Sequence, residues 1–178
     1  MYKIVPWTTD LDLTHFYADA ARRGFTNNSS QRVMIDCFKN ENEWKVWILY
    51  YNEVAVGSVA AHSISEGYRI CARTCVLTDL LPARSLRTRN EIITHQHVTA
   101  QFLMPVCIKW AVSKDMYITT HPSDVGTQRL VHTIWGPSLE KSGVLTKAFE
   151  KEYRGQVQTF WKLNPTIFLT QLAAVKWQ

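Results

Sequence analysis

The stretch that decides the fold reads CARTCVLTDLLPARSLRTRNEIITHQHVTAQFLMPVCIKWAVSKD and runs from Cys71 to Asp115. Its first part, which ends at Asp79, is rich in β-branched and small residues and predicts a strand. Its last part has apolar residues at four-residue intervals, as on one face of a helix: Val98, Phe102, Val106 and Trp110. This spacing predicts a helix whose wide apolar face lies against a sheet.

The connection between this strand and this helix is basic. Arg84, Arg87 and Arg89 lie within six residues of one another, just before the predicted helix start. The first N–H groups of a helix lack partners inside the helix and favour an anion, so a strand, a basic loop and a helix in this order suit a phosphate group. This connection is the clearest sign of a ligand in the sequence.

The composition indicates one folded domain over residues 1–178. Apolar residues make up 46% of the chain and aromatic residues 12%, which suits a sizeable core and argues against disorder. The net charge of +5 is compatible with an acidic ligand or with nucleic acid. Because the basic residues are spread along the chain, with no long run and no recognisable reader motif, we expect no nucleic-acid partner.

Cysteine and histidine positions predict reduced thiols and no metal. The four cysteines, Cys37, Cys71, Cys75 and Cys107, form no C-x-x-C pair and lie in apolar segments. His95 and His97 are two residues apart and would diverge on a helix, so we do not expect them to share a metal ion. No apolar run reaches the roughly 18 residues that span a bilayer, and the first residues do not resemble a secretory signal. We therefore expect a cytoplasmic protein that binds no membrane.

The remaining elements follow from periodicity and turn residues. Thr9 and Asp12 resemble a capping box and predict the start of the first helix. Asn52-Glu53 predicts a hairpin turn between two strands, and Arg154-Gly155 predicts another. The expected order is strand 2–7, two helices, strands 44–51, 54–64 and 68–79, the central helix, strand 116–121, helix 127–135, a terminal hairpin and an amphipathic tail from 165. This alternation predicts an α/β domain with a mixed, mostly antiparallel sheet.

This order of elements resembles the GNAT family of acetyl-CoA-dependent N-acetyltransferases over nearly the whole chain. Gly57 in the third strand matches a glycine that is common there in the family, and Trp110-Ala111 looks like the usual end of its central helix. The resemblance implies a GNAT-like sheet with a splay between the fourth strand, 68–79, and the fifth, 116–121. Divergent GNAT-like proteins of tailed phages look similar as well.

The resemblance also implies a binding mode for acetyl-CoA. The pantetheine would run beside three residues whose backbone groups the splay leaves unpaired: Val76, Leu77 and Thr78. The pyrophosphate would meet the start of the central helix, at His95, His97, Val98 and Thr99. The family motif R/Q-x-x-G-x-G/A is altered here, since His97 replaces its first glycine. We therefore expect Arg87 and Arg89 to supply positive charge to the phosphates.

For catalysis, the resemblance implies a base that deprotonates an amine and an acid that protonates the leaving thiolate. His62 and Asp79 are the candidate bases. The family's usual acid is a tyrosine on the helix after the fifth strand, but no tyrosine lies there, and His132 is the candidate. The expected acceptor is a small-molecule or peptide amine. The alternative is an inactive GNAT-like module that binds nucleic acid or a protein partner.

Overall fold

The computed structural model describes residues 1–25, 30–70, 75–81, 98–112, 114–120 and 143–174. These residues form two compact units, which are considered separately below. Unit 1 contains residues 1–63 and 71–110, and unit 2 contains residues 64–70 and 111–178. The expectation of a single domain stays a prediction.

Unit 1 is built on a meander of three antiparallel strands. These are β1 (Tyr2–Pro6), β2 (Trp44–Tyr51) and β3 (Val54–Ile64), and the short β5 (Cys75–Val76) pairs with β3. The predicted turn between β2 and β3 is confirmed, because Asn52 and Glu53 both have a positive φ, 47° and 64°. That pair of angles is typical of the two-residue turn that suits the twist of a hairpin.

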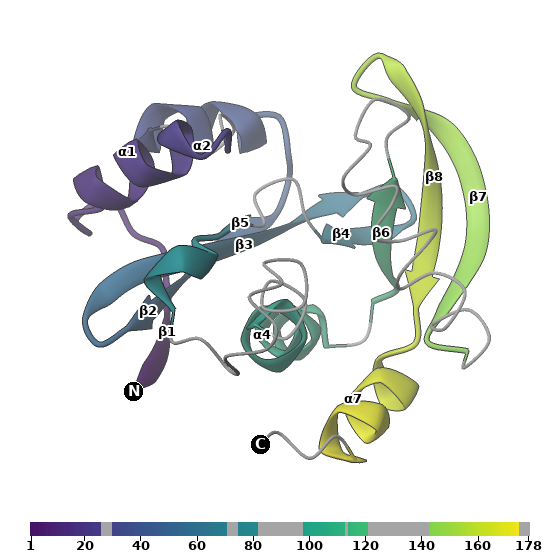
Figure 1. Ribbon diagram of the computed structural model, residues 1–178. Helices are drawn as coiled ribbons and strands as arrows, with labels where there is room; N and C mark the ends of the chain where they lie inside the picture. Colours follow the sequence, from purple (N-terminus) through teal and green to yellow (C-terminus); the bar gives the residue numbers. More distant parts are fainter. Residues whose placement is uncertain (26–29, 71–74, 82–97, 113, 121–142, 175–178) are drawn as a thin grey trace. The chain divides into compact units, whose positions relative to one another are not determined.

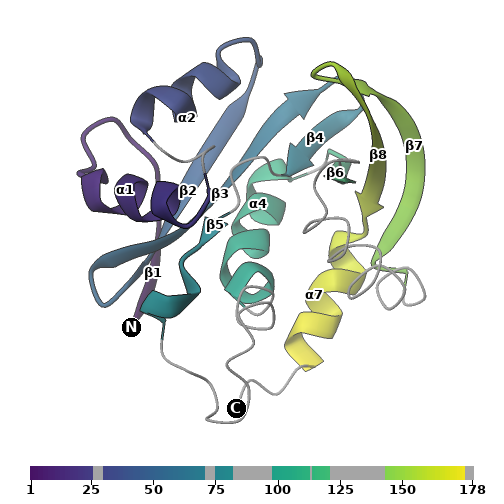
Figure 2. The same ribbon diagram turned by 45° about the horizontal axis from the view of Figure 1, so that its top comes forward.

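Helices lie on both faces of this meander (Figures 1 and 2). The helices α1 (Thr14–Arg22) and α2 (Gln31–Phe38) cover one face, where Val46 and Ile48 of β2 join the core. The central helix covers the other face, where the ring of Trp47 meets that of Trp110 at 5.8 Å, edge to face. Because successive strand residues point to opposite faces, this two-sided cover explains why β2 is apolar at nearly every position.

The central helix changes its winding along its length. Its described part passes through a π-helical segment, η3 (Thr99–Leu103), and continues as α4 (Met104–Ala111). Pro105 lies directly after this change and has no N–H to give to the turn before it. A π-helical segment of this kind is a known way to accommodate an interrupted hydrogen-bond ladder.

Unit 2 is a four-stranded sheet with one helix. The strands are β4 (Gly67–Ile70), β6 (Met116–Thr120), β8 (Gln156–Leu163) and β7 (Leu145–Tyr153), paired in that order. The β4–β6 pair is parallel, and the other two pairs are antiparallel. The helix α7 (Pro165–Ala174) follows β8 directly, and Asn164 caps it by accepting from the N–H of Ile167 at 3.0 Å. The predicted mixed and mostly antiparallel α/β class is confirmed.

One prediction about helix starts is wrong and another is confirmed. The Thr9–Asp12 pair does not form a capping box, because α1 begins only at Thr14, whose N–H donates to the Asp12 carboxylate at 3.2 Å. The polar run Asn27-Asn28-Ser29-Ser30 predicts a loop and a helix cap, and Ser30 is the cap of α2, since its hydroxyl accepts from the N–H of Val33 at 3.2 Å. The predicted helix 127–135 lies outside the described residues.

Candidate functional site

The predicted fourth strand, 68–79, is divided into two described parts, of which only the first pairs with β6. Its first part, β4, pairs in parallel with β6 over Tyr68–Ile70. Its last part, β5, pairs antiparallel with β3 through Cys75 and Val76. The described pairing with β6 therefore ends at Ile70 and β5 has no described pairing with β6, which is what the predicted splay requires.

The hydrogen-bond alternation of β5 turns the backbone of Val76 away from β3. The N–H of Leu77 donates to the carbonyl of Val56 at 2.7 Å, so these two residues are a hydrogen-bonded pair. Val76 and Gly57 form the neighbouring pair, which in an antiparallel ladder is not hydrogen-bonded. The N–H and C=O of Val76 consequently point outward, and the described residues give them no partner. Such groups can bind an extended, amide-containing chain as an added strand would bind.

Gly57 is needed for the close approach of β5 to β3. A Cβ at this position would lie 2.9 Å from the carbonyl oxygen of Cys75, which is part of the rigid backbone. The register against β2 also shifts between Leu49 and Tyr50, so Val56 is an extra residue in β3. A glycine inside a strand is typical of a bulge or of a close backbone approach, and the structure has both at this place.

The expectation of unpaired backbone groups is wrong for the N–H and C=O of Leu77 and for the C=O of Thr78. The N–H of Leu77 donates to Val56, as described above, and the carbonyl of Leu77 accepts from the N–H of Leu80 at 3.1 Å. The carbonyl of Thr78 accepts from the N–H of Leu81 at 3.2 Å. The cause is the short 3₁₀ helix η2 (Thr78–Leu80), which ends the strand and uses these groups internally. Only Val76 retains both groups for a ligand among the three, and contact of the cofactor with all three stays a prediction.

Asp79 forms a two-point ion pair with Arg23. One carboxylate oxygen accepts from Nε of Arg23 at 2.8 Å, and the other accepts from a terminal guanidinium nitrogen. This hydrogen bonding from Arg23 lowers the pKa of Asp79. A carboxylate held in this way accepts a proton only weakly. The sequence contains Arg22-Arg23 at the end of a predicted helix, but nothing in the pattern indicates a partner 56 residues away.

His62 is completely buried in unit 1. Its Nδ1 lies 3.4 Å from a carboxylate oxygen of Glu41 and 3.2 Å from the carbonyl oxygen of Ser63. Its ring packs against that of Phe38 with 5.6 Å between centroids. The imidazole is thus oriented by defined contacts inside the core, and its role as a base stays a prediction.

The thiols behave as core groups in the described part of the chain. Cys75 and Cys107 are buried and Cys37 is half-buried, and none of these three described cysteines is in a disulfide. Burial raises the pKa of the Cys75 thiol to about 12, so it stays protonated and is a poor nucleophile at neutral pH. This agrees with the prediction of reduced core cysteines.

Of the residues predicted to bind the phosphates, the structure describes only Val98 and Thr99. Val98 and Thr99, at the start of the central helix, are buried with 5% of their surface exposed. The other residues predicted for the phosphates and for the acid lie outside the described residues: Arg87, Arg89, His95, His97 and His132. Their roles stay predictions.

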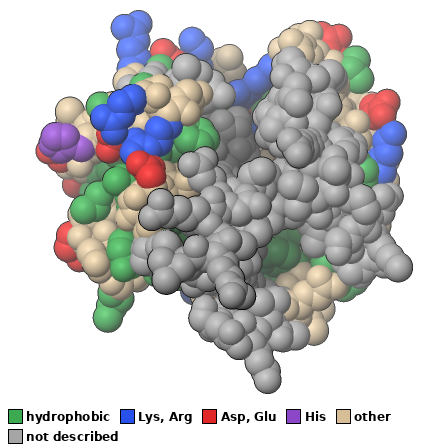
Figure 3. Space-filling view, viewed as in Figure 1, with side chains coloured by type: hydrophobic (Ala, Val, Ile, Leu, Met, Phe, Trp, Pro, Cys, Tyr) green, Lys and Arg blue, Asp and Glu red, His purple; other side chains and the backbone are tan. Residues whose placement is uncertain are grey.

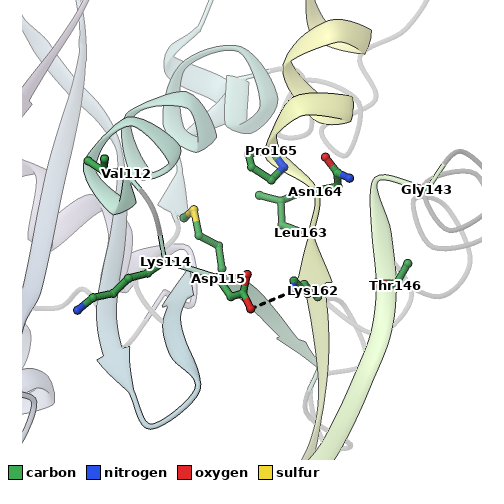
Figure 4. A pocket seen from close by; sticks show the side chains of 10 residues that line it. Val112, Lys114, Asp115, Gly143, Thr146, Lys162, Leu163, Asn164 and Pro165 are labelled. Carbon is green, nitrogen blue, oxygen red and sulfur yellow. Dashed lines mark hydrogen bonds and ion pairs between the residues drawn. The ribbon is translucent and has the colours of Figure 1, made fainter.

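Unit 2 has a pocket of about 320 Å³ between β6, the β7–β8 pair and α7 (Figure 4). Met116 and Leu163 contribute apolar lining, and the ion pair of Lys162 with Asp115 spans 2.9 Å at its wall. This pocket lies at the first residue of β6. It is therefore at the end of the strand opposite to the one where the predicted splay begins.

The described surface and side chains give no sign of a metal or a basic patch. No group of three potential metal ligands occurs among the described residues, and none of their helices is long and apolar enough to cross a membrane. In Figure 3, the coloured and therefore described part shows basic and acidic side chains beside one another rather than one continuous basic surface.

Comparison with solved structures identifies the fold as that of the GNAT N-acetyltransferases. The chain matches the ribosomal-protein-S18-alanine N-acetyltransferase from Escherichia coli with a TM-score of 0.53 and 11% identity, covering 92% of this chain and 93% of that one. It matches the aminoglycoside 6'-N-acetyltransferase from Enterococcus faecium with a TM-score of 0.52 and 13% identity, covering 92% and 98%.

A further similar structure is an aminoglycoside 6'-N-acetyltransferase complexed with coenzyme A, at a TM-score of 0.53 and 11% identity, covering 92% of this chain and 98% of that one. No family model and no curated protein matches the sequence. At this level of identity the likeness shows the GNAT fold alone. The likeness to phage proteins stays a prediction.

Proposed function

We propose that the protein is an acetyl-CoA-dependent N-acetyltransferase that transfers an acetyl group to an amine. The observation that carries the proposal is the outward-facing N–H and C=O of Val76, beyond the point where the described pairing of the fourth strand with β6 has ended. Pantetheine contains two amides, so it can pair with such a strand edge as a peptide would. The GNAT fold and the coenzyme A held by one structure of this fold support the same assignment.

The diphosphate of the cofactor requires positive charge or helix N–H groups. We assign it to the start of the central helix, next to Val98 and Thr99, with Arg87 and Arg89 as its basic partners. Because His97 stands where the family motif has glycine, the backbone cannot approach the phosphates as closely as it does with glycine. The arginine side chains then account for a larger share of the binding free energy.

The reaction requires an amine in its neutral form. The amine nitrogen attacks the thioester carbonyl carbon, the carbon–sulfur bond breaks, the nitrogen loses a proton and the sulfur gains one. Of the candidate bases, Asp79 is bound to Arg23 and His62 is enclosed in the core. We therefore assign proton removal mainly to water, with the neutral fraction of the amine as the reacting form, and we keep His132 as the candidate acid.

Titration calorimetry with acetyl-CoA tests the proposal on the native chain and on Val76→Pro. Proline removes the outward N–H but no hydrogen bond to β3, so the fold is expected to persist. A net contribution of about 1 kcal/mol for one hydrogen bond predicts binding about fivefold weaker. Arg87→Ala and Arg89→Ala each remove a charged hydrogen bond worth roughly 1.5–3 kcal/mol, which predicts binding about ten- to a hundredfold weaker.

The matched control is Val54→Ala, an exposed position at the other end of β3, for which binding should not change. If the native protein gives no heat of binding with millimolar acetyl-CoA, the proposed acetyltransferase activity is refuted and the non-catalytic binding module remains. Normal binding by Val76→Pro would refute the assignment of pantetheine to this strand edge. Normal binding by both arginine variants would refute the phosphate assignment.

A further inference from the structure

The pocket of about 320 Å³ in unit 2 has no part in the proposed acetyltransferase function. Its described lining residues all belong to unit 2, and they come from the segment before β6, the start of β7 and the junction of β8 with α7 (Figure 4). Pockets that bind small molecules begin at roughly 300 Å³. Since one water occupies about 30 Å³ in the liquid, this pocket has room for a molecule of about ten non-hydrogen atoms.

One part of the lining is apolar and lies next to an oriented amide. Met116 and Leu163 are directly opposite one another in β6 and β8, and they are buried, with 3% and 2% of their surface exposed. The N–H of Asn164 donates to the carbonyl of Val144 at 2.8 Å, and its Oδ1 accepts from the N–H of Ile167 at 3.0 Å. Because Oδ1 is engaged in this way, Nδ2 is the group of this carboxamide that can donate to a ligand.

The other part of the lining is charged. Lys162 donates to the Asp115 carboxylate at 2.9 Å, and this hydrogen bond raises the pKa of Lys162, so its ammonium is charged at neutral pH. An ammonium has three N–H donors, and the described contacts of Lys162 use one of them. Lys114 also lines the pocket, with its Nζ 4.7 Å from the ring centre of Tyr68. Two lysines and one aspartate give the described lining a net charge of +1.

The ion pair at this pocket is anchored by the sheet. The carbonyl of Asp115 accepts from the N–H of Tyr68 of β4 at 2.8 Å. Gly67 lies so close that a Cβ there would overlap the same carbonyl oxygen. Lys162 is a residue of β8, whose register against β6 is continuous from Thr159 to Leu163. Charged groups that are held by strands bind a ligand with less loss of conformational entropy than groups on loops.

We propose that this pocket binds an organic monocarboxylate with a compact apolar body. The carboxylate accepts from Lys162 and from Nδ2 of Asn164, Lys114 adds positive potential, and the apolar body contacts Met116 and Leu163. One carboxylate balances the net charge of +1, whereas a dianion or a cation would leave the pocket with an uncompensated charge, which costs free energy away from water. The inference goes beyond the proposed acetyltransferase and does not depend on it.

Matched small molecules test the chemical class on the full chain by titration calorimetry. Phenylacetate is an apolar monocarboxylate of the estimated size. Phenylacetamide has the same shape without the charge, phenethylamine carries a cation on the same ring, and acetate lacks the ring. We expect millimolar or tighter binding of phenylacetate and binding about tenfold weaker, or less, for the other three, because each loses the charged hydrogen bonds or the buried ring. Inorganic phosphate should also bind more weakly than phenylacetate.

Three variants test the location. Lys162→Met removes the ammonium at similar length and should weaken phenylacetate binding about fivefold, a modest factor because the Lys162 side chain is 45% exposed. Asp115→Asn removes the competing carboxylate and should strengthen binding about threefold. Lys147→Met is the matched control, because Lys147 is also a half-exposed lysine paired with a carboxylate, that of Glu150 at 2.7 Å, and is not among the described lining residues. It should bind like the native protein.

Several results would overturn the inference. These are no heat with millimolar phenylacetate, tighter binding of phenethylamine, phenylacetamide or phosphate, unchanged binding in Lys162→Met, and weaker binding in Asp115→Asn. Circular dichroism of each variant shows whether it is folded, and if Lys162→Met is not, Asp115→Asn and the matched molecules decide. None of these measurements uses acetyl-CoA. Failure here therefore leaves the proposed acetyltransferase standing, and absence of acetyl-CoA binding leaves this pocket standing.

Discussion

The two parts of the predicted fourth strand differ in what their backbone can bind. In β4, the N–H of Tyr68 donates to the carbonyl of Asp115 at 2.8 Å, and the strand is paired with β6 over its length. In β5, the neighbour is β3, and the groups of Val76 face away from it. Both parts are largely buried, so burial does not separate them. The comparison shows that hydrogen-bond alternation, and not side-chain burial, decides where a strand can accept a ligand.

The largest expected effect concerns β4. Gly67 has a φ of 151°, and a Cβ there would overlap the carbonyl oxygen of Asp115, a backbone atom that cannot move alone. We expect Gly67→Ala to lower the free energy of unfolding by about 3 kcal/mol or more, measured by urea denaturation. Gly155→Ala is the control, because its φ of 82° is also strained but no atom lies within 4 Å. Equal losses in the two variants would contradict a steric origin.

The next largest effect is the difference in stability between proline substitutions at two adjacent residues, Leu77 and Val76. Leu77→Pro removes the N–H that bonds to Val56 and a fully buried side chain, and should cost about 3 kcal/mol or more. Val76→Pro removes the outward N–H and exchanges a buried valine side chain for the proline ring, and should cost less, about 1–2 kcal/mol. Urea denaturation of the two variants measures the difference. If Val76→Pro were as damaging as Leu77→Pro, the assigned hydrogen-bond alternation would be wrong.

A smaller effect concerns the ion pair that follows β5. Because Arg23 lowers the pKa of Asp79 in the folded state, the pair stabilises the protein above the unfolded pKa of the carboxyl group. That contribution is lost as the pH falls through the lowered folded pKa. The Asp79 side chain is 52% exposed, so we expect Arg23→Gln to cost only about 0.5 kcal/mol at pH 7.

Urea denaturation of the native protein and of Arg23→Gln at pH 7 and pH 2.5 measures this contribution. The difference between the two proteins should shrink at the lower pH. A difference that grew on acidification would contradict the sign of the pKa shift.

The smallest effect is a difference in reactivity rather than in stability. The Cys75 thiol, with its pKa raised to about 12, should resist iodoacetamide at pH 8 in the native protein, whereas half-buried Cys37 should react. Peptide mass spectrometry after brief alkylation reads out both sites. In denaturant without reductant, all four cysteines should be labelled. Rapid native labelling of Cys75 would show that β5 is not held against β3 as described.

Local sequence patterns identified the elements that depend on neighbouring residues. The hairpin turns at Asn52-Glu53 and Arg154-Gly155, the cap at Ser30 and the two-sided apolar strand 44–51 were all predictable, and the structure has them. The start of α1 was not predicted correctly, because the Asp12 carboxylate accepts from the N–H of Thr14 and Thr9 does not form the expected capping box. Several short polar residues precede that helix, and any of them could have been the cap on sequence grounds.

In the candidate site as well, the features set by local sequence were predictable and those set by distant contacts were not. The sequence by itself determined the order of strands and helices, the glycine that β3 requires at Gly57 and the residue types available to a cofactor, because these follow from periodicity and turn chemistry. Only the tertiary structure decided that Val76 offers both backbone groups while Leu77 and Thr78 do not, and that Asp79 is held by Arg23. Each of these depends on a partner chosen by strand register or by a contact between distant residues, and a linear pattern does not contain that choice.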